Sequence, residues 1–247
     1  TLTSSTASGT ATVTGTVNAL AISSSALVAF TAGAATKYIL TTTNATPIAG
    51  SAVTISAQLA DANNNALATA ANVVTWSATG GGSFGSATST TNSSGIATVT
   101  FTTSATAATA HTVTGATAAL SGSSPTITTA SGVAANYLVT PAALNPAPTT
   151  LIAITAQLRD ANNNNVALAG QTVTWSSTNG GSFSAATSVT SAAGLATINF
   201  TTAGTSTVPV THVVTATTGG VTGNSVNVTT VAASVAQSTI AVSSASV

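Results

Sequence analysis

The sequence repeats itself after 99 residues, and this repeat limits the fold to a tandem array of similar units. Three segments return at that offset: VTISAQLADANNN (53–65) and IAITAQLRDANNN (152–164), VVTWSATGGGSF (73–84) and TVTWSSTNGGSF (172–183), SGIATVTFTT (94–103) and AGLATINFTT (193–202). Single residues follow the same rule, since Tyr38 matches Tyr137 and Asp61 matches Asp160. Several matches at one fixed offset indicate tandem structural units of about 100 residues each.

The offset grows to 101 residues towards the end of the second copy, where His111 matches His212. An insertion of two residues near Val208–Pro209 explains the change. Insertions of this kind lie in surface loops, so we expect a loop at this position.

The repeat also fixes the expected domain organisation. Residues 10–41 align with 110–140, and residues 235–242 align with the segment around Tyr38, where each copy begins. The expected boundaries are 1–34 for the C-terminal part of a preceding module, 35–133 and 134–234 for two complete modules, and 235–247 for the first strand of a following module. Partial copies at both ends predict a window cut from a longer array, with strand exchange between subunits as the alternative.

Apolar and polar residues alternate within each copy, which is the pattern of a β-strand with one buried face. Between Val53 and Leu59, for example, every second residue is apolar. Strands of the first copy are expected near 36–42, 51–60, 72–78, 82–90, 95–103, 110–117 and 124–130. Clusters of Gly, Asn, Asp, Ser and Pro, including DANNN (61–65) and SGSSP (121–125), predict the turns between them.

About seven short strands in about 100 residues predict an all-β fold made of tandem immunoglobulin-like β-sandwiches. No stretch shows helical spacing together with helix start and stop signals. Trp76 and Trp175 are expected as the central core residues, packed against Phe101 and Phe200. The chain has no Cys, so the disulfide of antibody domains is absent.

Charge is nearly absent, because the 247 residues include two basic side chains (Lys and Arg together) and two acidic ones (Asp and Glu together). Two cations cannot neutralise a row of phosphates, so nucleic-acid binding is not expected. The lack of Cys excludes thiolate metal sites, and no run reaches the ~18 apolar residues of a membrane span. Zero net charge promotes association, so we expect either glycans on Thr and Ser or permanent packing into an assembly.

The order of the motifs resembles that of the bacterial Ig-like domains of the invasin and intimin group, often called group 1. The resemblance rests on A-x-L-x-D-A-N-N-N, V-T-W-S, G-G-S-F and G-x-A-T-x-x-F-T-T, and it extends over the complete and partial copies. It implies stalk modules that hold a receptor-binding tip away from a bacterial cell, and therefore a cell-surface or extracellular location. The near-absence of charge departs from that group and leaves open a single stalk or a packed fibre.

The two Asp–Asn turns hold the only carboxylate side chains and are the candidate metal sites. Asp61 and Asn63, with their counterparts Asp160 and Asn162, offer the oxygen ligands that Ca²⁺ takes. One carboxylate per turn is little charge for a dication, and Asp and Asn are common in turns because they hydrogen-bond the backbone. A polar turn without metal is therefore the competing prediction, and no cofactor is expected.

No residues suited to catalysis are expected to come together. His111 and His212 belong to different modules, and the N-terminal copy has Ala11 at that position, so we expect a structural role at a strand start. Asp61 and His111 lie on different strands, whereas a Ser or Thr nucleophile needs a nearby base and an orienting acid. The sequence therefore predicts that the protein is not an enzyme.

Three functions remain open, of which the third is the weakest. The first is a spacer or stalk segment of a bacterial adhesin or extracellular fibre, in which each module contacts its neighbours in the chain. The second is a subunit of a homopolymeric filament or sheath, held by lateral packing of identical chains or by strand exchange. The third, a polysaccharide-binding module, needs exposed aromatic side chains, whereas the aromatic residues here are expected in the core.

Overall fold

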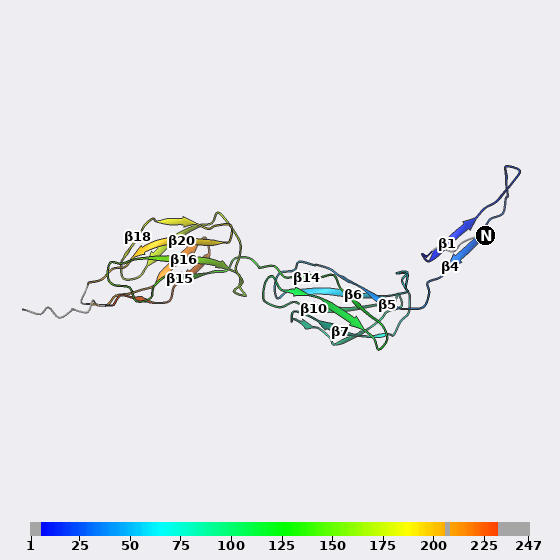
Figure 1. Cartoon of the computed structure of the whole chain (residues 1–247), viewed down its shortest axis with the longest axis horizontal. Helices are drawn as coiled ribbons and strands as arrows, with labels where there is room; N and C mark the ends of the chain where they lie inside the picture. The colour runs from blue at the N-terminus through cyan, green and yellow to red at the C-terminus, as the bar shows by residue number, and fades with distance from the viewer. Residues whose placement is uncertain (1–5, 206–207, 232–247) are drawn as a thin grey trace, which may run out of the picture. The chain divides into compact units, whose positions relative to one another are not determined.

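The computed structural model describes residues 6–205 and 208–231 (Figure 1). These residues form strands, turns and loops, which confirms the all-β prediction, and they include no helix that could cross a membrane. The chain divides into two compact units, Thr1–Ser131 and Gly132–Val247. Each unit contains one complete sandwich, called module 1 and module 2 below. The strand expected at 235–247 lies outside the described residues.

The first sheet of module 1 has four strands in the order β5-β6-β10-β8. Their bounds are β5 Lys37–Thr42, β6 Ala52–Ala60, β10 Ile96–Thr102 and β8 Ser83–Phe84. All three pairings are antiparallel, and the central one places Val99 opposite Ile55. Cross-strand neighbours on such a pair share a face, so these two side chains enter the core together.

The second sheet of module 1 has the order β13-β12-β7-β9. Its strands are β13 Ser121–Ser123, β12 Val113–Ala116, β7 Val73–Ala78 and β9 Thr88–Thr90. A separate short pair consists of β11 (Ala110–His111) and β14 (Ile127–Thr128), which are antiparallel. In the chain β11 comes directly before β12, and β14 follows β13.

Without β9, the strands of the two four-stranded sheets of module 1 follow one another along the chain as β5, β6, β7, β8, β10, β12 and β13. The first, second, fifth and fourth of these form one sheet, and the third, sixth and seventh form the other, which is the immunoglobulin arrangement. β9 is an additional strand at one edge of the second sheet.

Module 2 repeats this arrangement strand for strand. Its strands are β15 Asn136–Pro141, β16 Leu151–Arg159, β17 Thr172–Ser177, β18 Ser182–Phe183, β19 Thr187–Val189, β20 Leu195–Thr201, β21 Thr211–His212, β22 Val214–Thr218, β23 Val221–Asn224 and β24 Val228–Thr229. One parallel pair, Asn136 with Thr222, joins the two sheets at an edge. Both modules are therefore immunoglobulin-like β-sandwiches.

Each sandwich has its own hydrophobic core, built from the inward residues of the alternating strands. In module 1 the buried residues include Ile55, Val74, Trp76 and Phe101. In module 2 the corresponding positions are buried in a separate cluster that includes Trp175 and Phe200. The four aromatic residues named from the sequence thus lie in two distinct cores, with two in each.

The predicted strand at 82–90 is wrong, because this segment forms two strands that belong to different sheets. β8 pairs with β10, with Phe84 opposite Phe101, whereas β9 pairs with β7. The chain crosses between the sheets directly after β8, where Gly85 still donates to Thr100 O at 2.9 Å. Both strands show the same alternation, so periodicity does not reveal the change of sheet.

The predicted turn at 121–125 is also wrong in its first half, because residues 121–123 form strand β13. The turn lies earlier, where Thr117 N donates to Leu120 O at 2.8 Å. Gly122 is required by packing, since a Cβ on it would lie 1.9 Å from Tyr38 O on β5. The small, polar residues around Gly122 therefore lie where β13 passes close to β5, and they do not form a turn.

The segment before module 1 forms a small hairpin, called the N-terminal hairpin. In it β1 (Gly9–Val13) pairs with β4 (Ala26–Phe30), and β2 (Thr16–Val17) pairs with β3 (Leu20–Ala21). Ala11 lies opposite Val28, at the positions where module 1 pairs His111 with Ile127. Val13 is 38% exposed here, whereas the aligned Val113 is fully buried in module 1.

The two Trp side chains provide a direct test of the separate cores. The indole N–H of Trp76 donates to Ser89 Oγ at 3.0 Å, and that of Trp175 donates to Ser188 Oγ at 2.9 Å. We expect Trp76→Ala to destabilise module 1 by about 3–5 kcal/mol, through lost packing and a cavity, and to leave module 2 unchanged. Denaturant unfolding checks this, because Trp175 fluorescence then reports on module 2 alone and hydrogen exchange reports on module 1.

The reciprocal variant Trp175→Ala serves as the control and should destabilise module 2 alone. A loss below about 1 kcal/mol in the altered module would show that its Trp is not a core residue.

Candidate functional site

The Asp–Asn turn of module 1 begins at Asp61, directly after β6 ends. The turn closes by two backbone hydrogen bonds, from Asp61 N to Asn65 O and from Asn64 N to Asp61 O. Asn64 has a φ of 67°, a left-handed conformation that Asn adopts more readily than most residues. The run of Asn residues therefore suits a tight turn at the end of a strand.

The carboxylate of Asp61 is surrounded by N–H donors. Oδ1 accepts hydrogen bonds from Asn63 N at 2.9 Å and from Asn65 N at 2.8 Å. Oδ2 accepts from Gly33 N at 2.8 Å and from the Asn65 side-chain amide at 2.8 Å. An ionised carboxylate has about four lone-pair sites, and these four donors occupy them. The side chain is buried, yet its charge is fully hydrogen-bonded.

Module 2 builds the same cage around Asp160. Its Oδ1 accepts from Asn162 N and Asn164 N, each at 2.9 Å. Its Oδ2 accepts from Gly132 N at 2.8 Å and from the Asn164 amide at 3.0 Å. The arrangement is therefore a property of the repeat and not of one turn.

These donors hold both carboxylates in the ionised form. The side-chain hydrogen bond from Asn65 is the largest influence on Asp61, and with the backbone N–H groups it lowers the pKa to about 2 against the opposing effect of burial. For Asp160 burial is the largest single influence and raises the pKa, but the hydrogen bonds from Gly132 and the turn together outweigh it, so the pKa is lowered.

The calcium prediction named Asp61, Asn63, Asp160 and Asn162. The structure brings Asn63 and Asn162 to the carboxylates through their backbone N–H groups, which are donors and cannot bind a cation. A cation at either carboxylate would have to displace donors that already occupy its lone pairs. The described residues also contain no group of three or more His, Cys, Asp or Glu side chains placed to hold a metal.

Sequence reasoning missed Gly33 and Gly132, which reach the carboxylates from the segments that enter each module. A signal was present, because Gly33 precedes Asp61 by 28 residues and Gly132 precedes Asp160 by the same number. The equal spacing points to these contacts only when the Asp–Asn turn is already known to bind the entering segment. From the spacing alone, neither Gly could be identified as a partner of the carboxylate.

The half-buried side chain of Gln58 holds the next part of the same loop in place. The side-chain amide of Gln58 donates to Leu59 O at 3.0 Å, Ser94 O at 3.1 Å and Leu67 O at 3.3 Å. The neighbouring Gly95 has a φ of 74°, and a Cβ there would lie 1.8 Å from Leu67 O. The loop after the Asp–Asn turn is therefore fixed against the turn that precedes β10.

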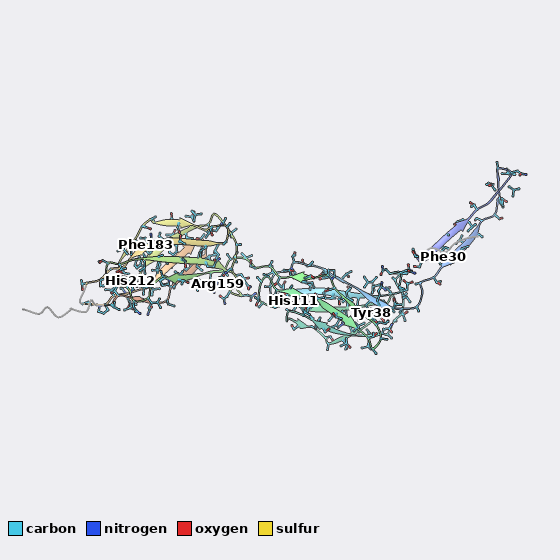
Figure 2. The ribbon with its side chains drawn as sticks, viewed as in Figure 1. Phe30, Tyr38, His111, Arg159, Phe183 and His212 are labelled. Carbon is cyan, nitrogen blue, oxygen red and sulfur yellow. The ribbon has the colours of Figure 1, made fainter. Side chains whose placement is uncertain are left out.

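The two His side chains lie within their own sandwiches, on β11 and β21, as Figure 2 shows. His111 Nδ1 donates to Thr79 O at 3.1 Å, and its Nε2 lies 3.3 Å from Ser104 Oγ. In module 2 His212 Nδ1 lies 3.0 Å from Thr178 O and Nε2 lies 3.4 Å from Ala203 O.

Each His ring also makes an edge contact with a core Phe, at centroid distances of 5.4 Å for Phe101 and 5.3 Å for Phe200. Both rings are fully buried, and both nitrogens of each ring have partners in the surrounding backbone or side chains. The hydrogen-bond partners of Asp61 and of His111 are different groups, so the described residues do not join them into a catalytic pair.

Comparison with models of protein families and with curated proteins finds no match. Among solved structures the chain is similar to the D00-D0 domains of intimin, with 18% identity, a TM-score of 0.47 and coverage of 78% of this chain and 100% of that one. It is also similar to FdeC, an adhesin of Escherichia coli, with 19% identity, a TM-score of 0.45 and coverage of 89% and 74%.

Invasin, a bacterial integrin-binding protein, is similar with 17% identity, a TM-score of 0.37 and coverage of 76% of this chain and 38% of invasin. These structures include domains of the group that the sequence motifs resemble. At such identities the likeness concerns the fold alone.

The caged carboxylates predict a specific response to acid. A folded-state pKa of about 2 lies below the usual 3.9, so the stabilisation is complete above about pH 4 and is lost as the pH falls towards 2. Asp61 and Asp160 are the only carboxylate side chains. We therefore expect thermal unfolding midpoints to fall in this window in the natural chain, and to change much less in the double variant Asp61→Asn, Asp160→Asn.

An unchanged acid transition in the double variant would contradict this assignment. Chelation provides the matching test for the metal alternative, because N–H donors are insensitive to it. If a chelator lowered the midpoint by more than about 5 °C at neutral pH, the turns would be calcium sites.

Proposed function

We propose that the chain is a structural spacer segment of a bacterial cell-surface or extracellular protein, and that it is not an enzyme. The observation that supports this most is a pairing between the beginning and the end of each module. In module 1 the segment after β5 runs parallel to the segment that includes β14. A spacer has to remain folded while force acts on its two ends, and this pairing connects those ends.

Three backbone hydrogen bonds make the connection in module 1. Thr128 N donates to Ala45 O, Ala130 N donates to Pro47 O, and Ala49 N donates to Ala130 O, each at 2.8 Å. The bridge between Ile48 and Ala130 is parallel. When two parallel segments are pulled from opposite ends, their hydrogen bonds are loaded together along the strand direction and do not open one after another.

Module 2 has two of these three hydrogen bonds. Thr229 N donates to Leu144 O at 2.8 Å, and Val231 N donates to Pro146 O at 3.0 Å. A further parallel bridge in module 2 joins Val139 on β15 to Ser225, directly after β23. Each module therefore has parallel pairing between its first and last segments, although the paired positions differ in part.

The polar groups of the described residues support a structural role. The two carboxylates and both His rings are used within the modules, as described above, and no Cys is present. None of the nine aromatic residues is exposed, although Phe30, Phe84 and Phe183 are partly accessible. A polysaccharide-binding module would present aromatic rings to the solvent, so this function has less support.

A homopolymeric filament or sheath is the second candidate, and the uncharged sheet faces favour it. Outward positions carry hydroxyl residues, such as Thr54 opposite Thr100 in module 1. Leu151 and Val189 of module 2 are each about 60% exposed, with values of 60% and 59%. Faces without charge do not repel one another, so identical chains would meet no electrostatic barrier to lateral packing.

Electron microscopy of intact producing cells, labelled with antibodies against residues 35–234, tests these proposals. We expect label on the outer surface, on thin and separate strands. Ordered bundles or tubes that carry the label would favour the filament instead. Label that appears only after the cells are broken would overturn both proposals, because each places the protein outside the cell.

A further inference from the structure

We infer that the Asp–Asn turn of module 1 is a docking surface for the extended backbone that precedes the module, so that it fixes the N-terminal hairpin to module 1 without a metal ion. This deepens the spacer function and rests on it, because only a spacer needs defined joints between its modules. The surface of module 1 consists of Asp61 and Asn65. Its ligand is the main chain at Gly33, in the entering segment, and at residues 6–8, in the chain leading into β1.

The first contact is the hydrogen bond from Gly33 N to the Asp61 carboxylate. It is charge-assisted, and such bonds are shorter and about twice as strong as neutral ones. A Cβ on Gly33 would lie 3.5 Å from Asp61 Oδ2, which is ordinary contact, and Gly33 has no positive φ. The carboxylate therefore recognises the N–H group of the entering segment and does not require a Gly at this position.

The second contact is made by the amide of Asn65, which engages the backbone twice. Its Oδ1 accepts from Ser8 N at 2.9 Å, and its Nδ2 donates to Thr6 O at 2.8 Å. The Asn65 amide thus offers one acceptor and one donor to two backbone groups that are two residues apart. A β-strand pairs with a neighbouring strand through the same alternation of donor and acceptor. The partner that fits is an extended peptide segment, of any sequence that leaves the N–H group free.

The two contacts are linked through the turn itself, because the Asn65 amide also donates to Asp61 Oδ2 at 2.8 Å. Loss of the carboxylate would therefore release Gly33 and also free the amide that holds residues 6–8. Module 2 preserves the first contact, from Gly132 to Asp160 at the same 2.8 Å. A bond repeated at equal length in both modules indicates a feature of the repeat.

The test compares two variants at one position. Gly33→Pro removes the N–H donor, whereas Gly33→Ala keeps it and adds a tolerated methyl group. Spin labels are placed on the full chain at Thr12→Cys in the N-terminal hairpin and Thr100→Cys in module 1, both exposed positions in a protein without other Cys. We expect a narrow distance distribution in the parent and in Gly33→Ala, and a broad one in Gly33→Pro. Equal widths in all three proteins, narrow or broad, would overturn the inference.

A second pair of variants acts on the other side of the bond. Asp61→Ala removes the docking carboxylate, and Asn92→Ala removes a similar turn residue whose Oδ1 accepts from Ser94 N and Ile96 N within module 1. Hydrogen exchange at the Gly33 amide should become about tenfold faster in Asp61→Ala and stay unchanged in Asn92→Ala. Exchange at Gly132 in the same protein provides the internal reference.

Equal acceleration at Gly33 in both of these variants would show general loosening of module 1 and would overturn the inference. A further experiment adds Ca²⁺ alone to the parent protein and measures hydrogen exchange at Gly33. If Ca²⁺ slowed exchange at Gly33 in the parent protein, a cation and not the N–H group would be the ligand of the turn. None of these outcomes depends on where the protein resides, so they are distinguishable from failure of the proposed function.

Discussion

A strand whose residues alternate between apolar and hydroxyl side chains can bury one face only, and the rest of this structure depends on that constraint. The apolar face of β6 and β10 has to meet a second sheet, and β7 and β12 supply it. Within this second sheet Trp76 on β7 lies opposite Gly115 on β12, and a Cβ on that Gly would lie 3.0 Å from the indole. Each module closes its core in this way without help from the other, as the two separate buried clusters show.

The same alternation decides what remains outside. Hydroxyl and small side chains cover the sheets, so the surface has almost no charge to contribute to solubility or to recognition. Two of the four charged side chains are carboxylates, and the structure buries both among N–H donors. A buried charge without partners would be strongly destabilising, whereas a fully hydrogen-bonded one can hold several segments at once. In each module the carboxylate connects the turn after the second strand to the entering main chain.

Most of the fold could be predicted from the sequence because most strands bury one face and expose the other, which gives a clear alternation of apolar and polar residues. The alternation located β6 and β10 within one residue at each end, and the repeat transferred the result to module 2. It failed at β8 and β9, where the chain changes sheet, and at β13, where Gly122 is required by contact with Tyr38. The Asp–Asn turn was recognisable from its composition, but its partner Gly33 was not. That contact depends on tertiary structure, which no local pattern encodes.

The chain consists of two modules, each with its own core, and the first and last segments of each module are paired in a way that would resist force. Stretching a single chain between its two ends tests this most directly. We expect two separate unfolding events, each lengthening the chain by about 30 nm, as about 99 folded residues become extended. A single event of twice that length would mean that the modules unfold together. Gradual lengthening without distinct force peaks would mean that the parallel pairing does not resist force. Either result would contradict two separately folded, force-resistant modules.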